Sequence, residues 1–352
     1  MQLPPSLRDA IEQEIRTCDR AALRAASARL SECYREAEPV PVASNAAPNV
    51  LANSVSSSAT LPRAAPPHVA LANAPLSNDA QRAAYLAVRL PATYAAAVAA
   101  FGWVRESSSA EIHTVLDLGS GPGTALWAAT AIFSTIDAAT AFERDPRLIE
   151  IARRLALRAD HSALREATWV QGDLTATIPE GSWDLVVCSY TLNELREPQR
   201  AEFIRKAWAR TRSLLVVIEP GTKRGFANVL AMRTRLLAEG ATLAAPCPNS
   251  LVCPMAREGD WCHFAARVER SAEHRRLKDA TLGHEDEKFS YVAFARAEVQ
   301  SPSARIVRHP KIFSGYTQLT LCREGEIRNA TITRSKKEDW RRLKRLGWGD
   351  AW

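Results

Sequence analysis

The feature that most constrains the fold of this chain is an apolar strand that runs directly into a glycine-rich turn. Thr114–Leu118 has the pattern of a short β-strand, and Asp117-Leu118-Gly119-Ser120-Gly121-Pro122-Gly123 overlaps its end. Glycine permits sharp bends and lets a ligand come close to the backbone. In α/β sheets, ligands bind at the carboxyl ends of strands. The segment therefore predicts a cofactor loop in an α/β domain.

Strand and helix patterns alternate along the chain after this turn. Four further strands are predicted at Ala138–Phe142, Thr168–Gln171, Trp183–Ser189 and Leu214–Ile218. The helices are predicted at Ala125–Phe133, Arg147–Arg158, Gln199–Thr211 and Arg224–Glu239. Such alternation predicts a parallel, doubly wound sheet of the Rossmann-like α/β class.

The glycine turn resembles the first motif of class I methyltransferases, D-x-G-x-G-x-G, which implies S-adenosylmethionine as cofactor. Glu143 ends the second strand, where an acid would accept hydrogen bonds from ribose hydroxyls. Asp173 ends the third strand and is expected near the adenine, and Ser189 opens the stretch expected to line the methyl-transfer side. The candidate cofactor-binding residues are Asp117, Gly119, Ser120, Gly121, Gly123, Glu143, Asp173 and Ser189.

No catalytic residue can be assigned from the sequence. The Asn- or Asp-Pro-Pro-Tyr loop of amino-methylating enzymes is absent, and Ser189–Glu194 stands in its place. Cys188 lacks the Pro-Cys context of cytosine-C5 enzymes, so we interpret it as a buried apolar residue. Because a fold does not guarantee turnover, an active methyltransferase and a catalytically silent protein both remain open.

Four cysteines in the second half of the chain form a candidate metal site: Cys247, Cys253, Cys262 and Cys322. Thiolates select zinc, copper(I) or iron–sulfur clusters. Structural zinc normally uses C-x₂₋₄-C pairs, which these four residues do not form. Wider loops suit a [4Fe–4S] cluster better. From spacing alone, a cluster, a zinc ion and unligated buried cysteines all remain open. His263 is a candidate ligand, but we interpret it as a histidine beside the site or in the core.

With both motifs identified, the chain resembles the Rsm-type mitochondrial ribosomal small-subunit methyltransferase-like family and its bacterial relatives. The matching segments are Tyr85–Tyr94, Asp117–Gly123, Ile218–Gly225, Ala245–Pro254, Trp261–Phe264, Lys288–Val292 and Leu319–Cys322. The resemblance implies a [4Fe–4S] cluster on the four cysteines named above. It also implies association with ribosomal RNA and the small ribosomal subunit or its precursor. A catalytically silent assembly factor that binds rRNA is the first alternative, and a zinc-containing small-molecule methyltransferase is the second.

The charge of the chain suits a nucleic-acid partner. Its net charge is +7 and its pI about 9.2, which fits RNA but also an ordinary basic enzyme. Seven cysteines are too few for a disulfide scaffold in a chain of this size. The basic segment Arg334–Trp352 contains Trp340, Trp348 and Trp352. We expect these tryptophans to stack on unpaired bases, and the alternative is a solvated helical face whose tryptophans pack on the domain. A second basic run, Arg267–Lys278, is the alternative RNA contact.

We expect five parts in the chain: a helical arm (1–38, with Leu7–Ala37 as its helix), a flexible linker (39–76), a methyltransferase core with N-terminal helices (77–240), an iron–sulfur segment with the remaining strands (241–333) and a basic tail (334–352). Helices are predicted at 77–89, with Ser77 as N-cap, and at Pro91–Trp103. Strands are predicted at Phe289–Arg296, Arg305–Val307, Thr317–Cys322 and Ile327–Thr333.

With no signal core and no apolar run near ~18 residues, the chain is expected to be cytoplasmic, without a membrane partner, and monomeric off the ribosome.

Overall fold

The computed structural model describes residues 1–36, 76–257 and 260–352, so the predicted linker at 39–76 lies almost entirely outside the described residues. The core is an eight-stranded sheet in the order β3-β2-β1-β4-β5-β8-β6, with β7 also paired to β8. Its strands are β1 (Thr114–Leu118), β2 (Ala138–Glu143), β3 (Thr168–Gln171), β4 (Trp183–Ser189), β5 (Thr211–Pro220), β6 (Thr242–Ala245), β7 (Phe264–Glu269) and β8 (His284–Ala295).

The prediction of a parallel sheet is correct for five strands and wrong for the rest. Strands β1 to β5 pair in parallel. In contrast, β8 pairs antiparallel with β5, β6 and β7. The alternating strand and helix pattern ends after β6, and a long excursion brings the chain back along β5 in the opposite direction. The sequence pattern did not reveal β6 or β7.

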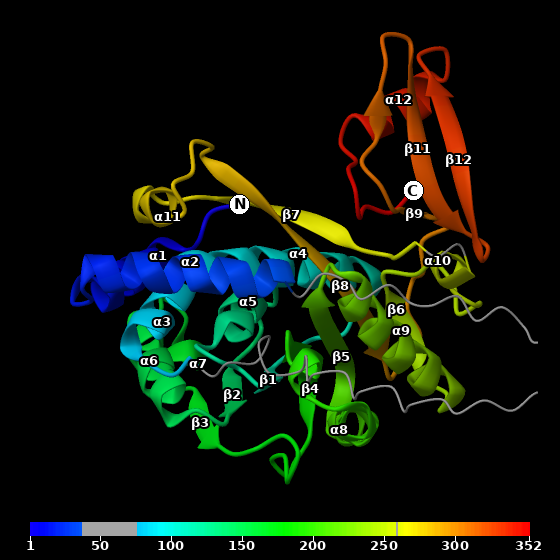
Figure 1. Ribbon diagram of the computed structural model, residues 1–352. Helices are drawn as coiled ribbons and strands as arrows, with labels where there is room; N and C mark the ends of the chain where they lie inside the picture. The colour runs from blue at the N-terminus through cyan, green and yellow to red at the C-terminus, as the bar shows by residue number, and fades with distance from the viewer. Residues whose placement is uncertain (37–75, 258–259) are drawn as a thin grey trace, which may run out of the picture.

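Helices cover both faces of the sheet (Figure 1). Alternate residues of each strand point to opposite faces, so Val115, Leu185 and Val216 join one core cluster while Leu116, Val186 and Val217 join the other. The first face carries α4 (Leu90–Ser107), α5 (Thr124–Ile132), α6 (Pro146–Ala156) and the short α7 (Ser162–Arg165). The second carries α8 (Glu197–Ala209) and α9 (Lys223–Ala238).

The predicted single helix at Leu7–Ala37 is two helices, α1 (Pro5–Arg16) and α2 (Arg20–Glu36). The carboxylate of Asp19 accepts a hydrogen bond from the Ala22 amide at 2.8 Å, which starts the second helix. Both helices pack on the first face of the core. An ion pair of 2.8 Å joins Arg154 on α6 to Glu14 on α1.

The two helices predicted around Pro91 form one continuous helix, Asp79–Ser107. It comprises α3 (Asp79–Ala84), a π-turn η1 (Tyr85–Arg89) and α4, and its N-cap is Asn78 rather than Ser77. The wider π-turn lies directly before Pro91, which has no amide proton to donate. By length and composition this helix could cross a membrane, and 78% of its most apolar window is buried inside the protein.

A second, four-stranded antiparallel sheet forms the C-terminal part and lies beyond the edge of the core (Figure 1). It contains β9 (Arg305–Ile306), β10 (Lys311–Ile312), β11 (Tyr316–Arg323) and β12 (Glu326–Thr333), followed by α12 (Lys337–Leu343). Three of these strands were predicted, and β10 was not. Two short helices, α10 (Pro254–Arg257) and α11 (Ala272–Leu277), lie in the excursion between β6 and β8.

Candidate functional site

The glycine loop after β1 needs its glycines for steric reasons. Gly119, Gly121 and Gly123 have positive φ angles of 78°, 52° and 82°. A Cβ on Gly119 would lie 2.9 Å from Thr191, and a Cβ on Gly123 would lie 2.8 Å from the Trp169 ring. A Cβ on Gly121 would meet nothing within 4 Å. The loop is therefore packed at both ends and open in the middle, where a ligand can approach the backbone.

Glu143 holds the loop against the end of β2. Its carboxylate accepts hydrogen bonds from the amides of Gly121 at 2.8 Å and of Arg144 and Asp145 at 2.9 Å. The amide of Gly119 donates to the Phe142 carbonyl at 2.8 Å. Glu143 thus lies beside the open middle of the loop, and all these hydrogen bonds join it to backbone amides.

Asp117 is a buried acid without a partner. Its side chain is 1% exposed, and neither carboxylate oxygen has a hydrogen-bond partner within the described residues. Burial, with a smaller contribution from the charge of Glu143, raises the pKa of Asp117 to about 8. The hydroxyls of Ser120 and Thr124 in the same loop are also buried without partners. A ligand that brings hydrogen-bond donors and positive charge would satisfy this group, and S-adenosylmethionine carries an ammonium and a sulfonium.

The other two predicted cofactor residues occupy neighbouring strand ends. Asp173 accepts hydrogen bonds from the Thr175 amide at 2.8 Å and hydroxyl at 2.7 Å, which lower its pKa. Its carboxylate is 4.0 Å from Arg144, next to Glu143. Ser189 ends β4, and its carbonyl accepts a hydrogen bond from Thr191, the residue that packs on Gly119. All eight predicted cofactor residues therefore lie at or just beyond the carboxyl ends of β1, β2, β3 and β4.

A strained residue, which the sequence did not reveal, follows β4. Tyr190 has a φ of +58°, a backbone conformation that is costly outside glycine. Its hydroxyl donates to Glu287 at 3.0 Å, and the same carboxylate accepts two hydrogen bonds of 3.0 Å from Arg89 in the π-turn. Strained residues and π-turns both cluster at functional sites. Nothing local in the sequence pairs these three residues, because they come from distant elements.

Glu219, at the end of β5, is the second acid that sequence reasoning missed. It is 0% exposed, and it accepts hydrogen bonds from the Leu192 amide at 2.9 Å and the Asn228 side chain at 3.2 Å. Burial raises its pKa to about 7. It anchors the segment after β4, where a methyl acceptor would lie. A signal was present, since a lone Glu ends an otherwise apolar strand.

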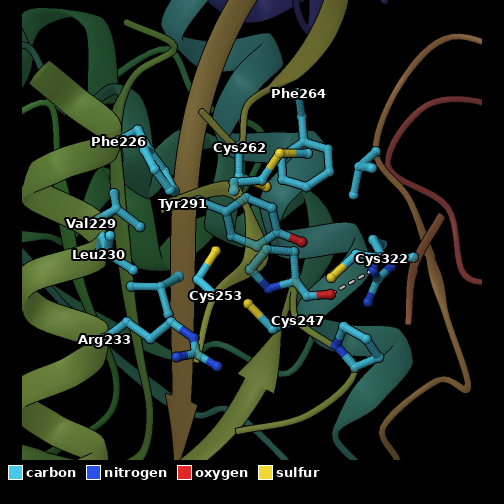
Figure 2. A pocket seen from close by; sticks show the side chains of 16 residues that line it. Phe226, Val229, Leu230, Arg233, Cys247, Cys253, Cys262, Phe264, Tyr291 and Cys322 are labelled. Atoms are coloured by element: carbon cyan, nitrogen blue, oxygen red, sulfur yellow. Dashed lines mark hydrogen bonds between the residues drawn. The ribbon is translucent and has the colours of Figure 1, made fainter. Parts of the chain in front are cut away.

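The four predicted metal-binding cysteines line one cavity of about 40 Å³ between the core and the C-terminal sheet. Figure 2 shows their sulfur atoms around a common space, with Tyr291 and Phe264 beside them. Cys247 follows β6, Cys253 precedes α10, Cys262 precedes β7 and Cys322 lies on β11. Segments far apart in the sequence therefore meet here. Within the described residues, the structure contains no group of three or more His, Cys, Asp or Glu side chains already arranged around a single metal ion.

The pKa values of the cysteine thiols depend on burial and on one another. Burial, and then the charges of Cys247 and Cys253, raise the pKa of Cys322 to about 12. Burial also raises the pKa of Cys262 well above its usual value, with the other three cysteines as the next causes. Burial and Cys247 raise the pKa of Cys253. Four thiolates so close together and so buried need positive charge to form, and a metal centre supplies it.

Two buried arginines also line this cavity. Arg233 is 6% exposed and donates to the carbonyls of Asn249 at 3.0 Å and Leu251 at 2.8 Å. Arg305 is 2% exposed and donates to the carbonyls of Pro246 at 2.8 Å and Gly349 at 2.9 Å. These partners are neutral, so the cavity holds buried positive charge that an anionic group would compensate. The sequence signal for Arg233 was its place on the apolar stripe of α9.

The remaining predicted residues fall outside both sites. His263 is 7% exposed and stacks on Trp261 with ring centroids 5.0 Å apart, as expected for a core histidine. Cys188 is completely buried in β4. Cys18 lies between α1 and α2, half-buried against the core.

The two basic regions differ in available charge. In the run Arg267–Lys278, Arg267 pairs with Asp286, and Arg270 and Lys278 both pair with Glu285, at 2.8 to 3.0 Å. In the tail, the basic side chains of α12 form no ion pair within the described residues, and Arg341, Arg342, Lys344 and Arg345 are exposed. The predicted base stacking by the tail's tryptophans is not what the structure shows. Trp340 and Trp352 pack on the C-terminal core cluster, and Trp348 packs against His263 and His309.

Comparisons with known proteins give a family and several relatives. Residues 79–352 match the family described as "Mitochondrial small ribosomal subunit Rsm22". The chain is 26% identical over 295 residues to the human "Ribosome assembly protein METTL17, mitochondrial", covering 76% of this chain and 61% of that protein. It is 25% identical over 334 residues to "Rsm22-cox11 tandem protein 2, mitochondrial" of Schizosaccharomyces pombe, covering 77% of this chain and 43% of that protein. The chain thus spans less than two thirds of the length of these relatives.

Solved structures similar to this chain include methyltransferases. Magnesium protoporphyrin IX methyltransferase from Synechocystis, with bound SAM, is 12% identical, covers 58% of this chain and 80% of its own, and gives a TM-score of 0.39. The putative RNA methyltransferase PH1948 from Pyrococcus horikoshii is 11% identical, covers 59% and 84%, and gives 0.36. These superpositions are too weak to carry an argument. The strand order, with antiparallel β8 beside β5, and the glycine loop after β1 identify the class I methyltransferase fold.

One expectation is overturned by these comparisons. The chain was expected to be cytoplasmic because its first residues are acidic and lack a signal core. The family description and the curated relatives are instead mitochondrial, so the cytoplasmic expectation is wrong.

Proposed function

Since the chain belongs to the Rsm22 family of mitochondrial small-ribosomal-subunit proteins, we propose that it is an iron–sulfur-containing, S-adenosylmethionine-binding factor that acts on small-subunit ribosomal RNA during assembly of the subunit. One observation carries the proposal. The cysteine set is completed by Cys322, which lies on the basic C-terminal sheet, whereas the other three cysteines come from the edge of the methyltransferase core. A metal centre here would cross-link the C-terminal sheet, which we propose binds RNA, to the methyltransferase core.

We propose a [4Fe–4S] cluster rather than a single zinc ion for this cavity because its ligands are widely spaced in the sequence. Four half-buried cysteines from separate segments line one space. A cluster spreads its ligands further apart than one ion does. A cluster held by four thiolates is also anionic, and the buried guanidiniums of Arg233 and Arg305 would compensate that charge. Bound metal would supply structural cross-linking at this place, with the four cysteines as its ligands.

The glycine loop supports S-adenosylmethionine binding. Gly121 offers open backbone, Asp117 offers an unpaired carboxylate, and Glu143 and Asp173 lie at the adjoining strand ends. The Asn- or Asp-Pro-Pro-Tyr loop of amino-methylating enzymes is absent from the segment after β4. We therefore propose binding at this site and leave methyl transfer unassigned.

The experiment that tests the proposal combines anaerobic purification with a matched pair of variants. Wild type and Cys18→Ser should retain iron and acid-labile sulfide, bind small-subunit RNA, and bind S-adenosylmethionine in calorimetry. Cys322→Ser should lose most of its iron and much of its RNA affinity while keeping S-adenosylmethionine binding, because the loop is formed by the core alone. Gly121→Arg should keep its iron and its RNA affinity but lose S-adenosylmethionine binding. A protein with no iron and no RNA affinity would overturn the proposal.

A further inference from the structure

The most exposed apolar feature of the C-terminal sheet is the turn of the β10–β11 hairpin. Ile312 is 80% exposed and Phe313 is 42% exposed. The amide of Phe313 donates to the Tyr316 carbonyl at 2.9 Å, which closes a four-residue turn. The rings of Phe313 and Tyr316 stack with centroids 4.6 Å apart and planes at 16°. The hairpin therefore presents a pre-stacked aromatic pair whose outer ring is exposed. We refer to residues 312–316 as the aromatic tip.

Basic side chains surround the aromatic tip. Arg334 lies next to it, since its amide donates to the Gly315 carbonyl at 3.2 Å. Lys336 and Lys337 follow at the start of α12, and Lys311 precedes the tip on β10; all four side chains are exposed and form no ion pair in the part of the chain that the structure describes. The chain from residue 311 onward contains ten basic and five acidic residues. Unneutralised charge is thus concentrated around an exposed ring.

The tip is also separate from the cysteine cavity. Cys322 lies six positions from Tyr316 along β11, which corresponds to about 20 Å at the usual strand rise. Figure 1 shows the hairpin turn at the end of the C-terminal sheet that points away from the core, on the same side as α12. A partner bound at the tip would therefore contact neither the cluster ligands nor the glycine loop.

We propose that the aromatic tip binds an unpaired base of single-stranded RNA, with the surrounding Lys and Arg side chains on the adjacent phosphates. Stacking of bases on exposed aromatic rings, combined with a basic surface, is the general chemistry of single-strand recognition. A duplex cannot use the tip in this way, because its bases are already stacked. The inference rests on the proposed function only in requiring RNA as the partner. It also replaces the tail's tryptophans, which pack inward, as the base-stacking element.

The test compares three substitutions on the same hairpin. Fluorescence anisotropy would measure the affinity of the cluster-loaded protein for a single-stranded oligoribonucleotide and for the same sequence as a duplex. Phe313→Ala should weaken single-strand binding about fivefold or more, as expected for loss of one stacked base, with no change in duplex binding or in the salt slope. Phe313→Trp should restore binding. Ile312→Ala, which removes a more exposed apolar side chain from the same turn, should change nothing.

The following results would overturn the proposal that the aromatic tip binds single-stranded RNA. Equal single-strand affinity of Phe313→Ala and wild type would overturn the inference while leaving the proposed function intact, and it is the result expected if the tip docks on a protein. Equal losses with Phe313→Ala and Ile312→Ala, or an equal loss for duplex, would also overturn it. No binding of either RNA by wild type at low salt would overturn both the inference and the RNA part of the proposed function.

Discussion

The glycine loop and the cysteine cavity bury ionisable groups of opposite kinds, and the difference indicates what each can hold. The loop buries an unpaired acid, Asp117, whose pKa is raised to about 8, among unpaired hydroxyls. The cavity buries two cations, Arg233 and Arg305, whose hydrogen-bond partners are neutral carbonyls. A buried charge without a partner is costly, so each site favours a ligand of the opposite sign. The loop suits a cation such as S-adenosylmethionine, and the cavity suits an anionic thiolate cluster.

The two sites also differ in how they are assembled. The loop is built by consecutive strand ends of a single sheet and would form without the C-terminal part. The cavity needs the core and the C-terminal sheet together. The loop should therefore survive damage to the cavity, and the following predictions test that asymmetry from the largest expected effect to the smallest.

Loss of one metal-binding cysteine should destabilise the C-terminal sheet and leave the core unchanged. We expect Cys322→Ser to lose most of its iron and to accelerate hydrogen exchange across β11 and β12, because metal ligation is coupled to folding. Exchange in β1 and β4 should remain as in wild type, and Cys18→Ser serves as the control in mass spectrometry. Uniform loosening of the whole chain would contradict the asymmetry.

Removing the buried carboxyl group of Asp117 should weaken binding of the ligand and stabilise the unliganded protein. Asp117→Asn should reduce S-adenosylmethionine affinity by roughly tenfold or more, since a hydrogen bond to a charged group contributes about 1.5–3 kcal/mol. Calorimetry with wild type as reference measures this. Unchanged affinity would show that Asp117 faces no cationic part of the ligand.

The pH dependence of stability tests Asp117 in the unliganded protein. The pKa of Asp117 is raised from 3.8 to about 8, so the folded state binds a proton that the unfolded state releases between these values. The stability of the unliganded protein should therefore fall as pH rises from about 4 to about 8 through this group. Asp117→Asn should lose that contribution and melt at a higher temperature than wild type at pH 8. Parallel melting curves for the two proteins across this range would exclude a buried, unpaired carboxylate.

Removing one buried arginine beside the cysteines should moderately lower the stability of the metal-loaded protein. We expect Arg233→Met to lower the free energy of unfolding of the metal-loaded protein by about 1–3 kcal/mol, because two carbonyls lose a charged donor and the cluster loses a counter-charge. Arg233→Lys should lose less, since it keeps the charge. A Met variant with higher metal occupancy than the Lys variant would contradict an anionic occupant.

The smallest effect is expected at the exposed charges. Lys336→Ala and Lys337→Ala should each flatten the log–log dependence of RNA affinity on salt by ~0.7–0.9 if each side chain contacts a phosphate. Lys278→Ala makes the same charge change in the other basic run, where the lysine already pairs with Glu285 at 2.9 Å, and should leave the slope nearly unchanged. Deleting residues 334–352 would be a poor substitute, because Leu343 is buried in the C-terminal cluster.

The sequence predicted the contiguous features well. β1, β3 and β4 were placed with the bounds the structure gives them, because each is a short apolar run bounded by polar or glycine residues. The glycine loop was identifiable for the same reason, since its steric demands are local. The four cysteines were grouped as a candidate metal site from the sequence, but the choice of a [4Fe–4S] cluster depended on a family resemblance, because no local pattern relates Cys322 to Cys247.

What the sequence could not supply was the pairing of distant groups. The antiparallel direction of β8, the link from Arg89 through Glu287 to Tyr190, and the inward packing of Trp348 all depend on contacts between segments far apart in the chain. Formal charge was equally uninformative. The two basic runs look alike in sequence, and only the structure shows that Arg267 and Arg270 are paired.

The most direct test of the account is the metal content of the wild-type chain. The protein would be purified anaerobically from iron-supplemented cells, and iron, zinc and acid-labile sulfide would be quantified together with Mössbauer spectra of ⁵⁷Fe-labelled material. The account predicts about four iron and about four sulfide ions per chain, with the spectrum of a thiolate-bound cubane. Stoichiometric zinc without sulfide would contradict it, because the cavity would then hold a single ion.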